Sequence, residues 1–183
     1  MKHTSHKAKK TQRRLVLVEE ILVGLRSPKI YDVISYRTWD ESKIRAFMHS
    51  HLIEAMQRVF RSLQPHQHAR TIERKATNAV LWEGDIGVTI SNIQFFGVQH
   101  RPDFVINAEG VKIAVEIKRG ESGSEVRDGI GQSMVYATHF DFVVYLFIDT
   151  SRDKKIKASI KNAVEARLVH TLWQDFNIKL SVI

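Results

Sequence analysis

Three ionisable residues at short spacing give this sequence its clearest indication of chemistry. Asp103 follows Pro102, and after 12 intervening residues come Glu116 and, two positions later, Lys118. Two carboxylates without a cysteine suit a hard cation such as Mg²⁺, which takes one or two protein carboxylates and keeps water and substrate phosphate as its other ligands. A lysine beside such a cation can help to activate an attacking water. This combination indicates phosphodiester hydrolysis.

A predicted β-hairpin positions these residues. Apolar residues predict strands over 103–106 and 111–118, and residues 107–110 form the predicted four-residue loop between them. Alternation along the strands gives the hairpin one wholly apolar face, because successive side chains point to opposite sides. That face consists of Phe104, Ile106, Val111, Ile113, Val115 and Ile117. The opposite face carries the three ionisable residues.

The expected register brings the two carboxylates together. If Ile106 pairs with Val111, Asp103 lies opposite Ala114, and Glu116 is its diagonal neighbour at about 7 Å between Cα atoms. Both carboxylates could then share one cation. A plainer interpretation of the same pattern is a solvated hairpin face with an ordinary Glu/Lys pair.

The remaining elements predict an α/β fold with a mixed β-sheet sandwiched by helices. Apolar spacing predicts helices over 14–26, from about 38 or 40 to 63, over 125–139 and over 156–176. Strands are expected as a meander within 70–97, then over 141–148 and 178–182. We expect a single domain over 15–183, in which 15–37 is a helical extension and 38–183 the core.

Composition and charge narrow the class of protein. The chain has 183 residues, a net charge of +8 and no cysteine, which excludes disulfides and thiol nucleophiles. No apolar segment is long enough to cross a bilayer, so we expect an intracellular, cytoplasmic protein that is not secreted. Residues 1–14 carry six basic residues and no acidic one, which predicts a flexible basic arm. The arm either binds nucleic-acid phosphates or serves solubility.

The order of motifs and elements resembles the PD-(D/E)XK nuclease superfamily, which has a restriction-endonuclease-like fold. Pro102-Asp103 and Glu116-Ile117-Lys118 match its motif, and the predicted elements over about 40–183 follow its core order αβββαβ with a further helix and strand. Gln132 and Tyr136 are similar to the Gln-x-x-x-Tyr pair of several branches. Four residues apart, they share one face of the predicted helix.

The resemblance implies a Mg²⁺-dependent endonuclease acting on DNA, with Mn²⁺ able to substitute. Asp103 and Glu116 would bind the metal with the Ile117 carbonyl, Lys118 would help to activate water, and Gln132 and Tyr136 would orient water or the scissile phosphate. A further catalytic acid is expected from the first core helix or the meander, and the candidates in order are Glu54, Glu41, and Glu83 or Asp85.

Flanking phosphates would be bound by basic residues, namely Arg119 and Arg127 together with Lys7, Lys9, Lys10, Arg13 and Arg14 of the arm. DNA is therefore the expected partner, a homodimer is compatible with this reading, and neither a membrane nor a nucleotide cofactor is expected. Two alternatives stay open. One is an inactive nucleic-acid-binding module of the same fold, and the other is a nuclease that acts on RNA or on DNA ends.

Overall fold

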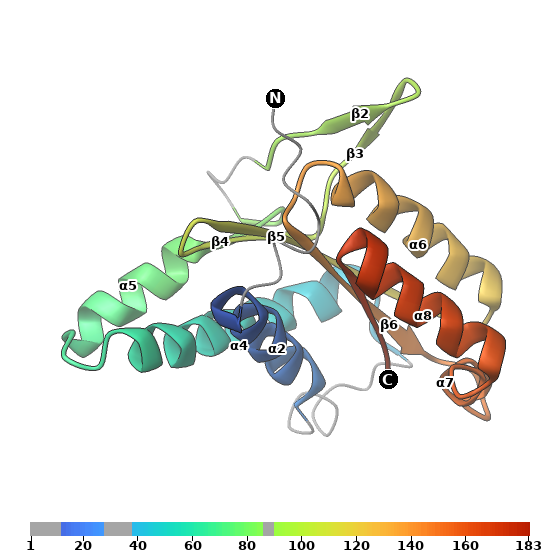
Figure 1. Cartoon of the computed structure of the whole chain (residues 1–183), viewed down its shortest axis with the longest axis horizontal. Helices are drawn as coiled ribbons and strands as arrows, with labels where there is room; N and C mark the ends of the chain where they lie inside the picture. The colour runs from blue at the N-terminus through green and yellow to red at the C-terminus, as the bar shows by residue number, and fades with distance from the viewer. Residues whose placement is uncertain (1–11, 28–37, 86–89) are drawn as a thin grey trace.

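A five-stranded mixed β-sheet with helices on both faces forms the centre of the molecule (Figure 1). The computed structural model describes residues 12–27, 38–85 and 90–183. The helices are α2 (Gln12–Arg26), α4 (Glu41–Leu63), α5 (Ala69–Ala79), α6 (Gly123–Ala137), α7 (Lys155–Ser159) and α8 (Ala163–Phe176). The strands are β1 (Val80–Trp82), β2 (Ile93–Phe95), β3 (Val98–His100), β4 (Phe104–Ala108), β5 (Val111–Gly120), β6 (Phe142–Asp149) and β7 (Ile178–Val182). The predicted α/β class is confirmed.

The sheet has the order β1-β4-β5-β6-β7. β1, β4 and β5 pair antiparallel, whereas β5, β6 and β7 pair parallel. Parallel neighbours need a crossover connection, which α6 supplies between β5 and β6, and α7 with α8 between β6 and β7. The interior strand β6 is buried along its whole length, as expected for a strand covered on both faces.

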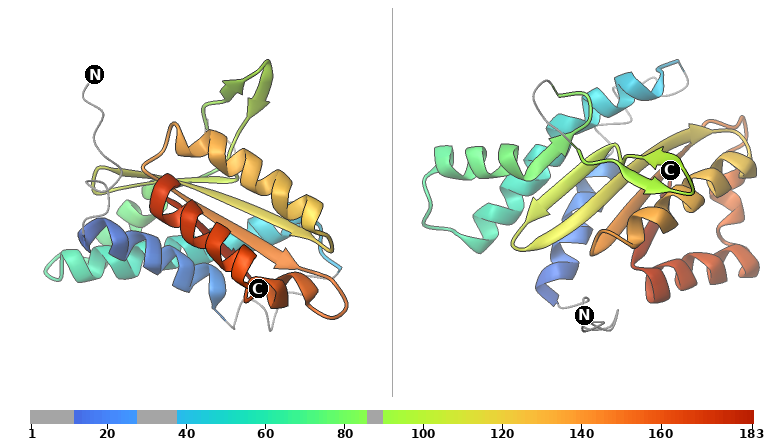
Figure 2. Two further views of the ribbon diagram at one scale, coloured as in Figure 1. Left: turned by 45° about the vertical axis from the view of Figure 1, so that its right-hand side comes forward. Right: turned by 90° about the horizontal axis from the view of Figure 1, so that it is seen from above.

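Two helical layers bury the two faces of the sheet (Figure 2). α2, α4 and α5 pack against the hairpin face that was predicted to be apolar, and all six of its predicted residues belong to this core. α6 and α8 pack against the other face, where Ala114 and Tyr145 contribute to a second apolar cluster. The side of the hairpin that carries Glu116 therefore faces α6.

The β4–β5 hairpin keeps the predicted faces but has a different register. Ile106 pairs with Ile113, and Ala108 with Val111, so the connection is the two-residue turn Glu109-Gly110 rather than a four-residue loop. Both turn residues have positive φ, which is the geometry of a type I′ turn and matches the twist of the strands. The shift is two residues, so every side chain stays on its predicted face.

The segment expected to begin a meander at 70 is instead the helix α5. Ile72, Ala76 and Ala79 are its buried residues, at spacings of four and three, which is the helical period. The strand prediction was wrong here because few apolar residues, most of them small, mark the helical period. The β-branched residues that follow in the chain favoured strands instead. Strand structure starts only at Val80. Ile86 and Val88, also expected in strands, lie outside the described residues.

The single helix expected over 156–176 is two helices, α7 and α8. The buried Asp149 carboxylate accepts hydrogen bonds from the backbone N–H groups of Ile156 and Lys157, at 3.0 and 2.9 Å, and so fixes α7 at the end of β6. The apolar spacing continues through the break, which made the pattern misleading. Val164, a member of that stripe, has an exposed fraction of 78%.

The first described helix, α2, begins at Gln12, two residues before its predicted start, so the last residues of the predicted arm are helical. Arg14 Nη1 lies 3.6 Å from Asp141 Oδ1, which connects this helix to the start of β6. Lys7, Lys9 and Lys10 lie outside the described residues. In the described part of the chain, no helix is both long and apolar enough to cross a membrane.

Candidate active site

The two predicted carboxylates meet at neighbouring positions of the sheet. Asp103 directly precedes β4, and Glu116 lies in β5. Continuing the observed register by one pair places Asp103 directly opposite Glu116, rather than diagonal to it. Each residue is only 2% exposed. Two carboxylates buried this closely need compensation from cations or hydrogen-bond donors.

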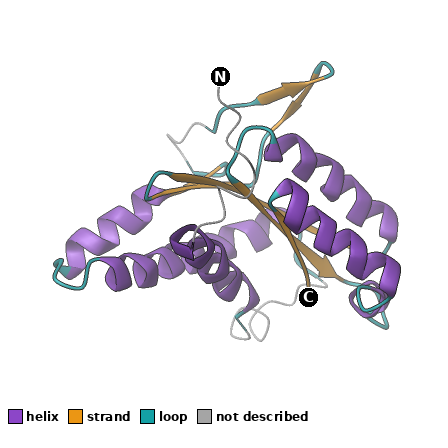
Figure 3. Ribbon diagram, viewed as in Figure 1, coloured by secondary structure: helices purple, strands orange, loops and turns teal. Residues whose placement is uncertain are grey.

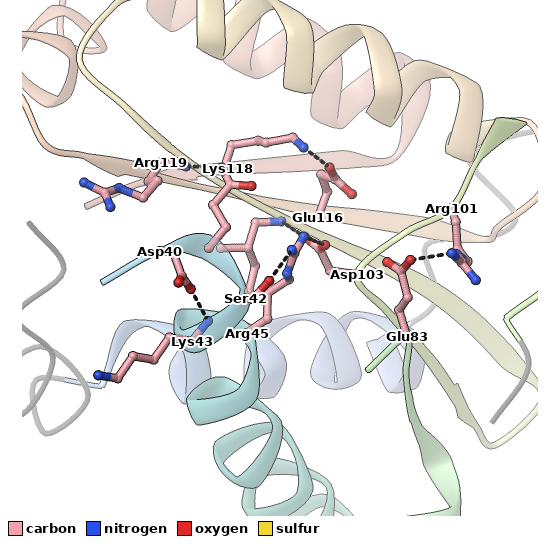
Figure 4. A network of polar contacts seen from close by, with 12 residues as sticks. Asp40, Ser42, Lys43, Arg45, Glu83, Arg101, Asp103, Glu116, Lys118 and Arg119 are labelled. Carbon is pink, nitrogen blue, oxygen red and sulfur yellow. Dashed lines mark hydrogen bonds and ion pairs between the residues drawn. The ribbon is translucent and has the colours of Figure 1, made fainter. Parts of the chain in front are cut away.

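Asp103 receives that compensation from two donors (Figure 4). Arg45 Nη1 lies 2.5 Å from Asp103 Oδ1, and the backbone N–H of Ile117 donates to Oδ2 at 2.7 Å. Arg45 comes from the second turn of α4, which Asp40 begins by accepting a hydrogen bond from the Lys43 N–H. The carboxylate is therefore held in one orientation between a helix of one layer and the adjacent strand.

Glu116 is only half satisfied. Its Oε1 lies 3.1 Å from Lys118 Nζ, whereas its Oε2 is buried and has no hydrogen-bond partner. Gln132 Oε1 is also buried without a partner. Both residues line the same cavity of about 300 Å³, together with Asp103, Lys118 and Tyr136. Unpartnered buried oxygens are rare in folded proteins and indicate that the cavity accommodates a donor or a cation.

The electrostatics of the cavity follow from this crowding. Burial, reinforced by the negative charge of Asp103, raises the pKa of Glu116 to about 8. Burial also raises the pKa of Asp103, against the opposing charge of Arg45. Burial alone would lower the pKa of Lys118, but the neighbouring Glu116 outweighs it and raises this pKa. A divalent cation would favour the charged carboxylates and displace the proton that burial favours.

A hard cation fits the donors that line the cavity. The two carboxylates and the Gln132 amide supply oxygen atoms, and one oxygen of each of Glu116 and Gln132 is unpartnered. Within the described ranges, no group of three or more His, Asp or Glu residues is placed to hold a metal ion. The protein thus offers two carboxylates, which is the set that Mg²⁺ uses when it keeps waters and binds substrate phosphate.

Helix α6 brings Gln132 and Tyr136 to the cavity, as their spacing predicted. Its start is fixed by a capping box in which Ser122 and Glu125 satisfy each other's backbone. Tyr136 is buried, and burial raises its pKa, with a further rise from the charge of Glu116. Its hydroxyl therefore stays protonated and interacts with the Glu116 side chain. The alternative of a core role for Tyr136 also holds in part, since the ring belongs to the apolar cluster under α6.

The first candidate for the additional acid, Glu54, is not at the cavity. Its side chain is 61% exposed and lies 3.6 Å from His51. Glu54 is nine residues beyond Arg45, which is roughly 13 Å along the helix axis, and only the first turns of α4 approach the site. Glu41, the second candidate, accepts a hydrogen bond from the Arg119 N–H at 3.3 Å.

Glu83 is the acid that the fold brings to the cavity, whereas Asp85 does not line it. Glu83 Oε1 lies 2.5 Å from Arg101 Nη2. Arg45 and Arg101 also line the cavity and were not predicted as site residues. Arg101 stands two positions before Asp103, which is a usable signal, but nothing in the sequence pairs Arg45 with a residue 58 positions away.

The two predicted phosphate-binding arginines of the core do not line this cavity. Arg119 Nη1 donates to the Trp39 carbonyl, so it connects β5 to the start of α4. Arg127 lies on α6 beside a different, mostly apolar groove of about 560 Å³ between α6, α7, α8 and β7. Their role in binding DNA stays a prediction, as does that of the Ile117 carbonyl as a metal ligand.

Comparisons with known proteins establish no family for this chain. No protein-family model matches the sequence, and no curated protein matches it. Among solved structures, the chain is similar to the restriction endonuclease PspGI in a complex with substrate DNA, at 15% identity and a TM-score of 0.33. That match covers 98% of this chain and 80% of the other.

Proposed function

We propose that this chain hydrolyses phosphodiester bonds of DNA as a Mg²⁺-dependent endonuclease of the PD-(D/E)XK type. The observation that carries the proposal is the buried, unpartnered Oε2 of Glu116, beside Asp103 and within a cavity that also contains Lys118. An oxygen left without a donor at such a position costs free energy unless a ligand satisfies it. A cation held by Asp103 and Glu116 would do so.

Each residue of the cavity has a role in this proposal. Asp103 and Glu116 would hold Mg²⁺, or Mn²⁺ in its place, with the Ile117 carbonyl as a further ligand. Bound there, the cation would supply polarisation of the scissile phosphate. Glu116 holds the Lys118 ammonium at 3.1 Å, where it can orient the attacking water and stabilise negative charge on the phosphate. Gln132 and Tyr136 donate hydrogen bonds that position the water or a phosphate oxygen.

The charge of the whole chain supports a polyanionic substrate. Its net charge is +8, and the lysines and arginines of residues 1–14 account for six of these charges. Basic residues supply most of the affinity of proteins for the DNA backbone. Binding a small phosphorylated metabolite would not need this many basic residues.

One observation favours a second candidate, a nucleic-acid-binding module without activity. Arg45 already neutralises Asp103 at 2.5 Å, as it would in a site that needs no metal. The two candidates differ in what Arg45→Ala does. In a nuclease, the variant still binds Mg²⁺ and retains metal-dependent cleavage. In a binding module, it leaves the buried Asp103 carboxylate without its cationic partner and only destabilises the fold.

The decisive test is cleavage of branched, nicked, duplex and single-stranded DNA and RNA in Mg²⁺, Mn²⁺ or EDTA. Asp103→Asn, Glu116→Gln and Lys118→Met are each expected to lower the metal-dependent rate by about 100-fold or more, because each removes a group that acts on the transition state. DNA binding and melting temperature serve as checks of folding. Glu54→Gln is the matched control, since that exposed glutamate does not line the cavity. A wild-type cleavage rate in a variant that carries all three substitutions would overturn the proposal.

The same assay tests the residues of α6. Gln132→Ala and Tyr136→Phe are expected to lower the single-turnover rate more than the affinity for DNA, because their hydrogen bonds act mainly in the transition state. Val135→Ala, a buried neighbour on the same helix, should cost about 1 to 3 kcal/mol of stability and leave the rate per folded molecule intact. Early melting with a normal rate in Gln132→Ala would assign Gln132 a structural role instead.

A further inference from the structure

The β2–β3 hairpin stands apart from the main sheet (Figure 3). β2 and β3 form a separate two-stranded sheet, in which Phe95 pairs with Val98 at the tip and Ile93 with His100 at the base. Ile93 is buried in the apolar cluster beneath α6, which anchors the base of the hairpin. The tip projects away from the main sheet in Figure 1 and in the left-hand view of Figure 2.

The tip of this hairpin is apolar and exposed. Phe95, Phe96 and Val98 have exposed fractions of 47, 91 and 57%. The rings of Phe95 and Phe96 contact each other edge to face, with centroids 4.5 Å apart. Two aromatic rings side by side on a projecting tip are a common feature of contact surfaces, whereas single exposed apolar residues are normal.

The turn gives Phe96 no structural reason to be aromatic. Phe96 and Gly97 have φ values of 46° and 78°, the left-handed pair of a type I′ turn, whose first position favours Asn, Asp or Gly. A bulky residue is disfavoured there. The β4–β5 hairpin has the same kind of turn with the polar pair Glu109-Gly110. Phe96 therefore neither suits the turn nor packs in the core, and a contact with another molecule would account for it.

The base of the hairpin belongs to the candidate active site. Asn92, Gln99, His100 and Arg101 line the cavity that contains Asp103. The chain from His100 to Phe96 is four residues long, which in extended conformation spans roughly 13 Å. At about 3.4 Å per nucleotide of one strand, this corresponds to about four nucleotide steps. A nucleic acid in the cavity thus lies within reach of the tip.

We propose that the Phe95–Phe96 tip stacks on an unpaired nucleobase of the DNA bound at the site. The proposal rests on the proposed function and specifies its substrate class, DNA with an unpaired base. Stacking on an aromatic ring strengthens binding by about 5- to 100-fold per base. Unstacking a base inside an intact duplex weakens binding by a comparable factor. The tip therefore favours DNA in which a base is already unpaired.

The test uses the full-length protein in EDTA and two duplexes with one 2-aminopurine each, either as a single-base bulge or paired with thymine. We expect wild-type protein to bind the bulged duplex about 5- to 100-fold more tightly and to change its 2-aminopurine fluorescence. Phe96→Asn should abolish both effects while keeping the turn, because Asn-Gly is a favoured type I′ pair. Phe96→Trp should retain both effects. Val164→Ala truncates another exposed apolar residue, on α8, and should change neither.

Equal affinity of wild-type protein for the two duplexes, or unchanged bulge preference and fluorescence in Phe96→Asn, would overturn the proposal. It would also be overturned if wild-type protein sedimented with phosphatidylcholine–phosphatidylglycerol vesicles and Phe96→Asn did not, because the tip would then bind lipid. Binding in EDTA needs no catalysis. Absence of cleavage by wild-type protein would overturn the proposed function alone and leave a positive stacking result standing.

Discussion

At the scale of single residues, the cavity places two buried carboxylates, Asp103 and Glu116, beside the partly buried cationic groups of Arg45 and Lys118. Asp103 is paired with Arg45 and with a backbone N–H, whereas Glu116 is paired with Lys118 through one oxygen only. Removing one partner of a buried charge pair costs more than the pair contributes, because the other charge is left uncompensated. The unsatisfied member, Glu116, therefore determines how the site responds to protons and metal ions.

The free energy of unfolding without metal should fall as the pH rises from about 4.5 to about 8. Burial and the charge of Asp103 raise the pKa of Glu116 from 4.5 to about 8. Between these values the folded protein holds a proton that the unfolded chain has released, so raising the pH favours unfolding. Glu116→Gln should flatten this dependence. Urea denaturation in EDTA at four pH values between 5 and 8 measures it.

Glu54→Gln is the control, because that glutamate is exposed and should leave the pH dependence unchanged. Mg²⁺ should stabilise the wild-type protein more at pH 8 than at pH 6, since it competes with the proton for Glu116. If the wild-type protein and Glu116→Gln lose stability in parallel over this range, Glu116 is not the titrating group.

At the scale of elements, α6 is positioned by close contact with the sheet. A Cβ atom at Gly129 would lie 2.2 Å from the Tyr145 hydroxyl, so the glycine permits the helix to approach β6. This close approach brings Gln132 and Tyr136 to the cavity that Glu116 also lines.

Gly129 and Gly131 of α6 should respond oppositely to alanine. Gly129→Ala must push Tyr145 or the helix away and should destabilise the protein by about 1 to 3 kcal/mol. At Gly131 a Cβ atom meets nothing within 4 Å, so Gly131→Ala should stabilise by about 1 kcal/mol through helix propensity. Urea denaturation of the two variants and the wild-type protein measures the changes in the free energy of unfolding. Similar stability changes in the two variants would contradict the close approach of α6 to β6.

At the scale of the whole molecule, the cavity lies where the two helical layers both reach the sheet. α4 contributes Arg45 from one layer and α6 contributes Gln132 from the other. The start of α2 lies near the same sheet, because Arg14 contacts Asp141, whose carboxylate also accepts the Lys112 N–H. Lys112 is four residues from Glu116 along β5, or roughly 13 Å. The eleven residues that precede α2 could span up to roughly 36 Å, which is enough to reach DNA at the site.

Deletion of residues 1–11 should weaken DNA binding and reduce its salt dependence. The deleted segment contains Lys2, Lys7, Lys9 and Lys10 and no acidic residue. Each lysine that neutralises a phosphate contributes about 0.9 to the slope of log affinity against log salt concentration. The slope is obtained from DNA affinities measured between about 50 and 200 mM salt, a range over which phosphate-binding proteins lose much of their affinity. An unchanged slope would show that the segment serves solubility only.

Local pattern alone determined the faces of the hairpin and the helix α4. Alternation in 103–118 assigned Glu116 and Lys118 to the side away from the apolar core, and the structure keeps that assignment despite a two-residue shift in register. Asp40 marked the start of α4, where it caps the helix. These features depend on neighbours in the chain and on the period of each element, so the sequence contains them.

Tertiary structure decided which distant residues complete the cavity. Arg45 and Glu83 come from segments that only packing brings to Asp103. The prediction of Glu54 as a site residue was wrong because a position on α4 fixes the side of the helix but not how far along the helix the site extends. The helix α5 and the break before α8 likewise depend on burial against other elements. Sequence pattern fixes the face that a residue occupies, whereas register, approach and ion pairing depend on packing between segments far apart in the chain.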